Sequence, residues 1–413
     1  MQDLNRHNLD ARGLARLRER PGVRAALAAL AGPGAETRLV GGCVRDALLG
    51  RDAADIDLAT THLPEAVMER TRAAGLKAVP TGIEHGTVTV IAAGEPIEVT
   101  TLREDVETDG RHAVVRFGGD FAQDAARRDF TVNALSLDAE GRLHDTTDGV
   151  ADLAAGRVRF IGDPATRIRE DALRILRFFR FHARFGGGAP DAQALAACIA
   201  ARDSLDRLSR ERVRAEFLKL LAAPGALAMV AVLSETGLLA RILGGVGELG
   251  RLDRALAAGQ PAPLAALAVL TREDAERLRE RLRLSNAEHQ ELDRYAAALA
   301  AARSRDTLTE PEIRALAAVH GLDAAAGALA VMAGEPRPAL PRDAGVILEA
   351  LRVGPPLILP VTGADLVERG LAPGRAVGQA LARARARWLA LGCPLDPESR
   401  EALITHALDG TAI

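Results

Sequence analysis

The stretch from Val40 to Asp57 constrains this chain more than any other part of its sequence. Gly41 and Gly42 follow a short apolar run and precede a helical pattern that Gly50 ends. A glycine carries no side chain, so its backbone can turn sharply and direct N–H groups toward an anion. The glycine pair therefore predicts a turn suited to a phosphate group.

The other end of this stretch carries two carboxylates. Asp55 and Asp57 alternate with the apolar Ile56 and Leu58, and alternate residues of a strand share one face. Mg²⁺ takes few oxygens from a protein and accepts others from phosphates. The combination indicates a Mg²⁺-assisted phosphoryl or nucleotidyl transfer. A solvated Asp-x-Asp turn is the alternative, and the neighbouring Gly-Gly-x-x-Arg-Asp pattern makes it the weaker one.

Glu98 offers a third carboxylate. It lies within a predicted strand, Pro96 to Leu102, where an unpaired charge among apolar residues is costly. It either joins the two aspartates, faces water on an edge strand or pairs with an arginine. The pattern also predicts further strands and two helices in this part of the chain: strands Thr37 to Val40, Asp55 to Thr60 and Thr87 to Ile91, and helices Val23 to Leu30 and Pro64 to Ala74.

Two polar segments follow the predicted strands. The residues from Arg103 to Phe121 are too charged to bury, so we expect a mobile loop there. The segment AARRDFTVNALSL then sets Arg127 and Arg128 among apolar residues. These arginines could bind a triphosphate, and Asp129 or Asn133 could bond a ribose hydroxyl. Solvated arginines at the start of a helix or strand are an equally plausible interpretation.

From Asp152 onward the sequence is almost wholly helical, with no convincing strand. The central predicted helix runs from Arg169 to Phe185, and every third position is polar, at Asp171, Arg174, Arg177 and Arg180. The first three residues would form one slanted stripe. Cytosine and adenine each present an amino donor beside a ring acceptor, so Asp171 could accept while Arg174 donates. A solvated charged face is the alternative. A second basic helix, RLSRERVRAEFLKLL, could face RNA or pair with Glu211 and Glu216.

Composition limits the classes of protein that fit. A chain of 413 residues suggests two to four domains, and the net charge of −3 argues against a uniformly cationic nucleic-acid coat. Cys43, Cys198 and Cys393 are too few and too far apart for a disulfide framework or a zinc site. No signal core or membrane-length apolar run is present. We therefore expect a soluble, cytoplasmic protein without a membrane association.

The motifs, taken together, resemble one family. GGCVRDALLG with DIDL, IEVTTLR, RRDFTVNAL, DGVADL, EDALRILRFFRF and RLSRERVRAEF occur in order between Val40 and Glu216. They resemble the class II tRNA nucleotidyltransferases, the family of CCA-adding enzymes and bacterial poly(A) polymerases. The segment Thr362 to Leu381 resembles the C-terminal part of bacterial members.

The resemblance implies an α+β fold, in which a mixed α/β nucleotidyltransferase head of the polymerase-β type precedes an all-α neck, body and tail. The corresponding boundaries are residues 1–150 for the head, 151–220 for the neck, 221–360 for the body and 361–413 for the tail. The neck would recognise the nucleotide base and tRNA, and the tail would bind tRNA.

The same resemblance assigns roles to residues. Asp55 and Asp57 would bind catalytic Mg²⁺, and Glu98 would be the third catalytic carboxylate. The implied nucleotide-binding residues are Gly42, Arg45, Arg128, Asp171, Arg174, Arg177 and Arg180. The implied reaction adds CCA to the 3′ end of tRNA from CTP and ATP, with two Mg²⁺ ions and release of pyrophosphate. A poly(A) polymerase, an enzyme adding only CC or only A, and an RNA-binding protein with a silent head are the alternatives.

Overall fold

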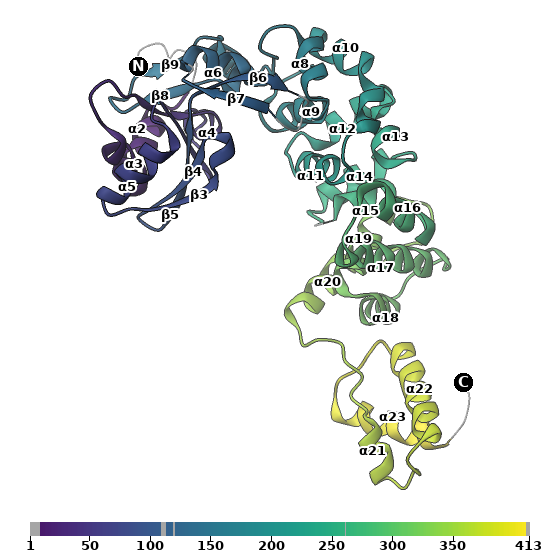
Figure 1. The fold of residues 1–413 in the computed structure, drawn as a ribbon. Coiled ribbons are helices and arrows are strands. Elements are labelled where there is room, and N and C mark those ends of the chain that lie inside the picture. Colours follow the sequence, from purple (N-terminus) through teal and green to yellow (C-terminus); the bar gives the residue numbers. More distant parts are fainter. Residues whose placement is uncertain (1–8, 109–112, 119, 261, 410–413) are drawn as a thin grey trace. The chain divides into compact units, whose positions relative to one another are not determined.

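The chain forms two units in the computed structural model, Met1–Met229 and Val230–Ile413, and each is described by itself (Figure 1). The structure describes residues 9–108, 113–118, 120–260 and 262–409. The boundary between the units falls inside helix α12, Ala226–Glu235. The finer division of the chain into head, neck, body and tail stays a prediction.

The first unit is built on a seven-stranded sheet with the strand order β3-β4-β5-β2-β1-β8-β9. Only β2 and β5 pair in parallel, and every other neighbouring pair is antiparallel. The strands are β1 (Thr37–Val40), β2 (Ile56–Thr60), β3 (Lys77–Gly82), β4 (Thr87–Ala92), β5 (Glu95–Thr101), β8 (Ser136–Asp138) and β9 (Leu143–His144). The predicted strands are confirmed, whereas β3, β8 and β9 were missed because β3 has no buried residue and the other two are short.

Four helices accompany this sheet: α2 (Ala11–Glu19), α3 (Pro21–Leu30), α4 (Gly42–Leu48) and α5 (Pro64–Ala73). Helix α3 packs against β4 and β5, and α5 against β3 and β4, while α4 contacts β1 and β2. Apolar residues of α3 recur at helical spacing, at Val23, Ala26, Leu27 and Leu30, and all are buried. The contact of α4 with β1 and β2 places the glycine turn next to the aspartate strand.

The segment from Arg103 to Phe121 was predicted as a loop, and this prediction is wrong. It contains a two-stranded antiparallel ribbon of β6 (Arg103–Thr108) and β7 (Ala113–Phe117). Paired strands satisfy each other's backbone groups, so a highly charged segment can still form a ribbon. Helix α6 (Phe121–Arg127) follows and begins with a capping box between Asp120 and Gln123.

The rest of the first unit is helical. Its helices are α7 (Gly149–Ala154), α8 (Pro164–Glu170), α9 (Leu173–Phe185), α10 (Ala192–Ala200) and α11 (Arg210–Leu221). The predicted single helix from Arg169 to Phe185 is therefore wrong, because the chain leaves helical geometry at Asp171, with φ −151° and ψ 107°. The Asp171 carboxylate accepts the Leu173 N–H at 3.0 Å, and such local bonds compete with helix formation. Asp171 thus does not share a helix face with Arg174.

A cluster of aromatic rings attaches α9 to the segment that follows α6. Phe130 lies 4.7 Å from Phe160 and 5.4 Å from Phe181, measured between ring centroids. Phe178 lies 5.9 Å from Phe160. Phe130 and Phe178 are fully buried, and ring contacts of this kind add to the stability that burial provides. The cluster fixes where α9 lies relative to the RRD motif.

The second unit is helical throughout its described residues outside the connecting segments. Its helices are α13 (Leu238–Leu243), α14 (Leu249–Ala257), α15 (Pro263–Ala268), α16 (Arg272–Leu282), α17 (Asn286–Arg303), α18 (Glu310–His320), α19 (Leu322–Met332), α20 (Ala344–Val353), α21 (Gly363–Glu368), α22 (Arg375–Ala390) and α23 (Pro397–Asp409). Trp388 of α22 is the largest side chain in a buried cluster with Leu366, Leu403 and Ile404. Among the described residues, no helix combines the length and apolar character needed to cross a bilayer.

Replacing Trp388 should destabilise the second unit. Its side chain is 2% exposed, and its indole N–H donates to the Pro394 carbonyl at 3.0 Å. We expect Trp388→Ala to lower the free energy of unfolding by about 3–5 kcal/mol, measured by urea denaturation. Leu391→Ala, at a site 44% exposed, is the matched control and should cost at most about 0.5 kcal/mol. Equal losses in both variants would contradict this description of the core.

Candidate active site

A cleft of about 780 Å³ lies within the first unit and gathers charged residues from β2, α4, α9 and α11. Its basic lining residues are Arg45, Arg127, Arg128, Arg174, Arg177, Arg180, Arg184, Arg212 and Lys219. Its acidic lining residues are Asp46, Asp52, Asp55, Asp57, Asp129 and Asp171. Every site residue predicted from the sequence lines this cleft except Glu98, which lies beside it on β5.

The three predicted carboxylates meet at β2 and β5. Asp55 immediately precedes β2 and is exposed, whereas Asp57 lies within the strand and is half-buried. Asp57 is directly opposite Glu98 in the parallel register of the two strands. Burial raises the pKa of Asp57 above its usual range, the charges of Glu98 and Asp55 raise it further, and Arg128 opposes them. The charges of Asp55 and Glu98 thus both act on the Asp57 carboxylate.

This carboxylate group fits a divalent cation as a partial ligand set. A cation would relieve the repulsion that raises the pKa of Asp57, and carboxylate oxygens suit hard cations. Within the described ranges, no three His, Cys, Asp or Glu side chains form a ready-made metal cage. A metal here would therefore take some of its oxygens from a bound phosphate or from water.

The glycine turn brings Arg128 next to the aspartate strand. Gly41 has φ +73°, a conformation that residues with a side chain rarely adopt. A Cβ atom at Gly41 would lie 2.6 Å from Nη1 of Arg128. Arg128 is also held by Asp124 of α6, with Nε donating to Oδ2 at 3.0 Å. The sequence therefore requires glycine at position 41 for both backbone geometry and space.

A buried chain of polar contacts links α4 to α9. Arg45 donates to Asp46 at 2.8 Å and also to the Asn133 side-chain oxygen. Asn133 donates to Asp129 at 3.0 Å, and Nε of Arg177 donates to Asp129 at 2.7 Å. Burial opposes ionisation of Asp129, but Arg177 and the Asn133 hydrogen bond outweigh it and lower its pKa. The ribose contacts predicted for Asp129 and Asn133 would have to share these engaged groups.

The arginines of α9 surround one aromatic ring. The guanidinium groups of Arg180, Arg177 and Arg45 lie 4.1, 5.3 and 5.4 Å from the centroid of Phe181. Nε of Arg180 also donates to Glu216 at 2.5 Å. Ring faces attract cations, so Phe181 helps to keep like charges close together. Each of these arginines is also paired with a carboxylate, Arg45 with Asp46, Arg177 with Asp129 and Arg180 with Glu216.

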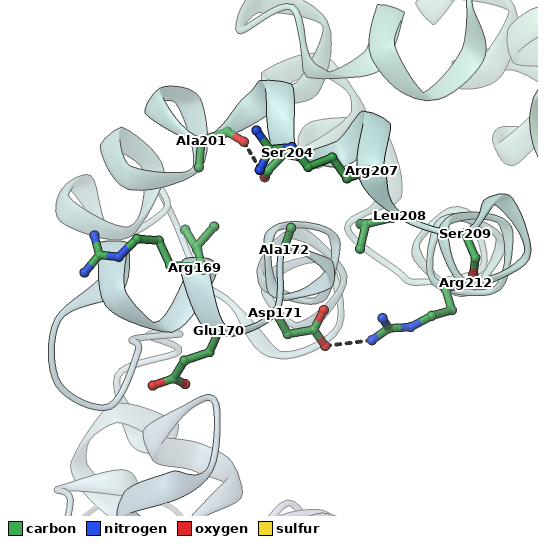
Figure 2. A pocket seen from close by; sticks show the side chains of 11 residues that line it. Arg169, Glu170, Asp171, Ala172, Ala201, Ser204, Arg207, Leu208, Ser209 and Arg212 are labelled. Carbon is green, nitrogen blue, oxygen red and sulfur yellow. Dashed lines mark hydrogen bonds and ion pairs between the residues drawn. The ribbon is translucent and has the colours of Figure 1, made fainter. Parts of the chain in front are cut away.

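Asp171 and Arg174 both line the cleft, but each has another ion partner. Asp171 Oδ2 accepts from Nη2 of Arg212 at 2.7 Å, which Figure 2 shows as a dashed line. Arg174 pairs with Glu170 and donates to the Arg167 carbonyl at 2.9 Å. The two side chains therefore approach the cleft from the end of α8 and from α9 rather than from one helix stripe.

Sequence reasoning missed several lining residues. Arg184 follows Arg177 and Arg180 at helical spacing, so extending the stripe by one turn would have found it. Lys219 and Arg212 belong to α11, which packs against α9. Only the tertiary contact shows that these two residues reach the same cleft. Arg212 was expected to face RNA or pair with neighbouring glutamates, and it pairs with Asp171 instead.

Comparison with known proteins identifies the class of this fold. Residues 37–159 match the family described as poly A polymerase head domain, and residues 189–246 match the one described as probable RNA and SrmB-binding site of polymerase A. The first unit thus contains a nucleotidyltransferase head of the poly(A) polymerase type. Over these residues the chain is similar to the class II CCA-adding enzymes, and nucleotidyltransferases of this kind generally use a divalent metal ion.

Individual relatives agree with this family. The chain is 39% identical over 263 residues to CCA tRNA nucleotidyltransferase 1, mitochondrial, of Danio rerio, covering 61% of each protein. It is 44% identical over 196 residues to the CCA-adding enzyme of Oceanobacillus iheyensis, covering 47% of this chain and 48% of that protein. The sequence matches thus span between about half and three fifths of the length of these two relatives. The CCA-adding enzyme of Bacillus stearothermophilus in complex with CTP superposes with a TM-score of 0.70 at 27% identity, covering 94% of this chain and 98% of that one.

Gly41→Ala should damage the cleft more than a matched glycine change elsewhere. Gly34 has the same φ of +73°, but nothing lies within 4 Å of the position of its Cβ. Both variants carry the left-handed strain of about 1–2 kcal/mol, and only Gly41→Ala displaces Arg128. We expect Gly41→Ala to weaken nucleoside triphosphate binding by about tenfold or more in calorimetry, and Gly34→Ala to leave it unchanged. Equal affinities in both variants would contradict the close contact with Arg128.

Proposed function

We propose that this protein adds C, C and A to the 3′ end of tRNA, using CTP and ATP and releasing pyrophosphate. The observation that carries the proposal is that one cleft joins the carboxylates of β2 to the arginines of α9. Negative groups at one end suit a metal and an attacking hydroxyl, and positive groups at the other suit a triphosphate. The names of the relatives support the same activity.

Asp55, Asp57 and Glu98 would hold Mg²⁺ in this reaction. When bound, Mg²⁺ would favour deprotonation of the RNA 3′-hydroxyl and neutralise charge on the departing pyrophosphate. The strand register fixes Asp57 opposite Glu98, so these two carboxylates keep their spacing as the substrate changes. Asp55 stands at the exposed start of the strand, where an incoming RNA end can approach it.

The arginines would bind and orient the triphosphate. Arg128 lies between the glycine turn and Asp57, which suits a contact to phosphate oxygens near the reacting atom. Arg177 and Arg180 extend the positive wall along α9. Gly42 lines the cleft with its backbone, while Arg45 is 6% exposed. Arg45 therefore contributes charge and support more than a direct contact.

Asp171 and Arg174 would select the base. A carboxylate accepts and a guanidinium donates, which matches the amino donor and ring acceptor of cytosine and adenine. Although Asp171 lies between α8 and α9 while Arg174 lies on α9, both reach the cleft. Selection would thus depend on protein side chains, without a nucleic-acid template.

The proposed partner is tRNA, bound through local basic patches. The match of residues 189–246 to a probable RNA-binding family supports an RNA contact. The net charge of −3 leaves no general attraction to a polyanion, so local basic patches would have to contact the RNA phosphates. Such contacts weaken as salt rises. We propose the cytoplasm as the location, since Cys43, Cys198 and Cys393 are all free and buried, as a reducing compartment allows.

One assay tests this function against poly(A) synthesis, which the name of the matched head domain keeps open. The protein is incubated with tRNA lacking its 3′ end and with each nucleoside triphosphate, singly and mixed, and the products are sequenced. Addition of C, C and A followed by a stop supports the proposal. A long A tail, or CC or A alone, would assign the protein to another branch. If no nucleotide is added, the alternative of an RNA-binding protein whose head is catalytically inactive would be favoured.

Removing the aspartates should abolish transfer while RNA binding remains. We expect Asp55→Ala or Asp57→Ala to reduce turnover by at least about a thousandfold, because a metal ligand is lost. Glu98→Gln keeps the shape but loses a charge, so a large but smaller loss is expected. Glu69→Ala, an exposed acid on α5, is the control and should behave as the wild type. Near-normal turnover in either aspartate variant would refute the metal assignment.

Base selection should depend on Asp171 and Arg174. Asp171→Ala removes the acceptor for the amino group, at a cost of about 1–3 kcal/mol, so the preference for CTP and ATP over UTP and GTP should fall about tenfold to a hundredfold. Arg174→Ala should act in the same direction. Single-nucleotide addition with all four triphosphates measures both. A wild-type preference in both variants would mean that other residues read the base.

A further inference from the structure

A second pocket lies behind the predicted base-reading residues. Its volume is about 430 Å³, and Arg169, Glu170, Ser204, Arg207 and Ser209 are among its lining residues (Figure 2). Only Asp171 and Arg212 line both this rear pocket and the cleft. The ion pair between them therefore separates the two spaces.

The backbone alone does not fix the direction of the Asp171 side chain. Asp171 lies outside both flanking helices, at the end of α8. Its carboxylate is held by two contacts, the Leu173 N–H on Oδ1 at 3.0 Å and Arg212 on Oδ2 at 2.7 Å. Each carboxylate oxygen can accept more than one hydrogen bond, so both contacts can persist while a base amino group binds.

The rear pocket makes the contact with Arg212 necessary. Its lining combines apolar residues with the cations Arg169 and Arg207, so a carboxylate that turned into it would meet these two positive charges. Asp171 is only half-buried, and packing does not prevent such a rotation. Arg212 stands 41 residues away in sequence on α11, and its guanidinium keeps the carboxylate at the wall of the cleft.

We propose that Arg212 is a positioning residue for base selection, which acts by holding the Asp171 carboxylate toward the nucleotide. This inference rests on the proposed function of Asp171. In this arrangement Nη2 of Arg212 donates to Asp171, and we assign Arg212 to positioning the carboxylate rather than to a contact with the base. The specificity of the site thus depends on α11 as well as on α9 and the residue between α8 and α9, which carry the reading side chains.

A competing explanation is that Arg212 contacts the substrate directly, since it also lines the cleft. A direct phosphate contact would raise the KM of all four triphosphates equally. A positioning role changes the ratio between them, because UTP and GTP do not use the Asp171 acceptor. The two explanations therefore predict different preferences between triphosphates. Because each preference is a ratio of rates measured on one preparation, the fraction of folded protein cancels from it.

The test measures single-nucleotide addition of CTP, ATP, UTP and GTP by the full chain. Arg212→Ala should lower the preference for CTP over UTP, and for ATP over GTP, by about tenfold. Arg212→Lys keeps a charged donor and should retain part of the preference. Arg207→Ala, which removes an exposed arginine from the rear pocket alone, is the matched control and should keep the wild-type ratio.

A double-mutant cycle identifies the route of the effect. If Arg212 acts through Asp171, Arg212→Ala should change the ratio no further in an Asp171→Ala background. An additive effect would overturn the proposal, and so would an unchanged ratio in Arg212→Ala or an equal loss in the Ala and Lys variants. A wild-type protein that adds no nucleotide would instead refute the proposed function itself.

Discussion

The cleft depends on one buried polar chain that joins Asp46, Arg45, Asn133, Asp129 and Arg177. The chain crosses from α4, beside the aspartate strand, to α9, which carries the arginines. Its central members, Arg45, Asn133 and Asp129, are each less than 9% exposed. Removing one partner from such a chain strands another buried charge, at a cost of about 3–5 kcal/mol. The distance between the two halves of the cleft is thus held by contacts that tolerate little change.

The two halves carry opposite excesses of charge. Asp55, Asp57 and Glu98 repel one another at the strands, as the raised pKa of Asp57 shows. Arg177 and Arg180 of α9 repel each other as well, and their ion pairs with Asp129 and Glu216 and their contacts with Phe181 offset this repulsion. A nucleotide with a bound cation has the complementary distribution, since its metal would meet the carboxylates and its phosphates the arginines. Substrate binding would relieve repulsion at both ends of the cleft.

The helix break at Asp171 frees the spacing between residues 171 and 174 from the geometry of a single helix. In one helix, residues at positions 171 and 174 would have a spacing set by helix geometry alone. Here α8 ends just before Asp171 and α9 begins just after it, and Arg212 of α11 forms an ion pair with the Asp171 carboxylate. If Asp171 reads the base as proposed, substitutions in α11 would change base selection while leaving the reading residues themselves unchanged.

The sequence by itself predicted the aspartate strand, the glycine turn and the resemblance to the family. Gly41 needs a positive φ and Asp57 lies on an alternating strand, and both requirements are local, so periodicity and residue type suffice to predict them. Strand β3 escaped prediction because it has no buried residue, and the β6–β7 ribbon escaped because the charges of REDVETDGRHA indicated a loop. Only the tertiary structure decided that Glu98 lies opposite Asp57, that the helix breaks at Asp171 and that Arg212 pairs with it. The first and third of these depend on residues tens of positions apart, and the second depends on a side chain that competes with the helical hydrogen bonds of the backbone. Local sequence patterns predict neither.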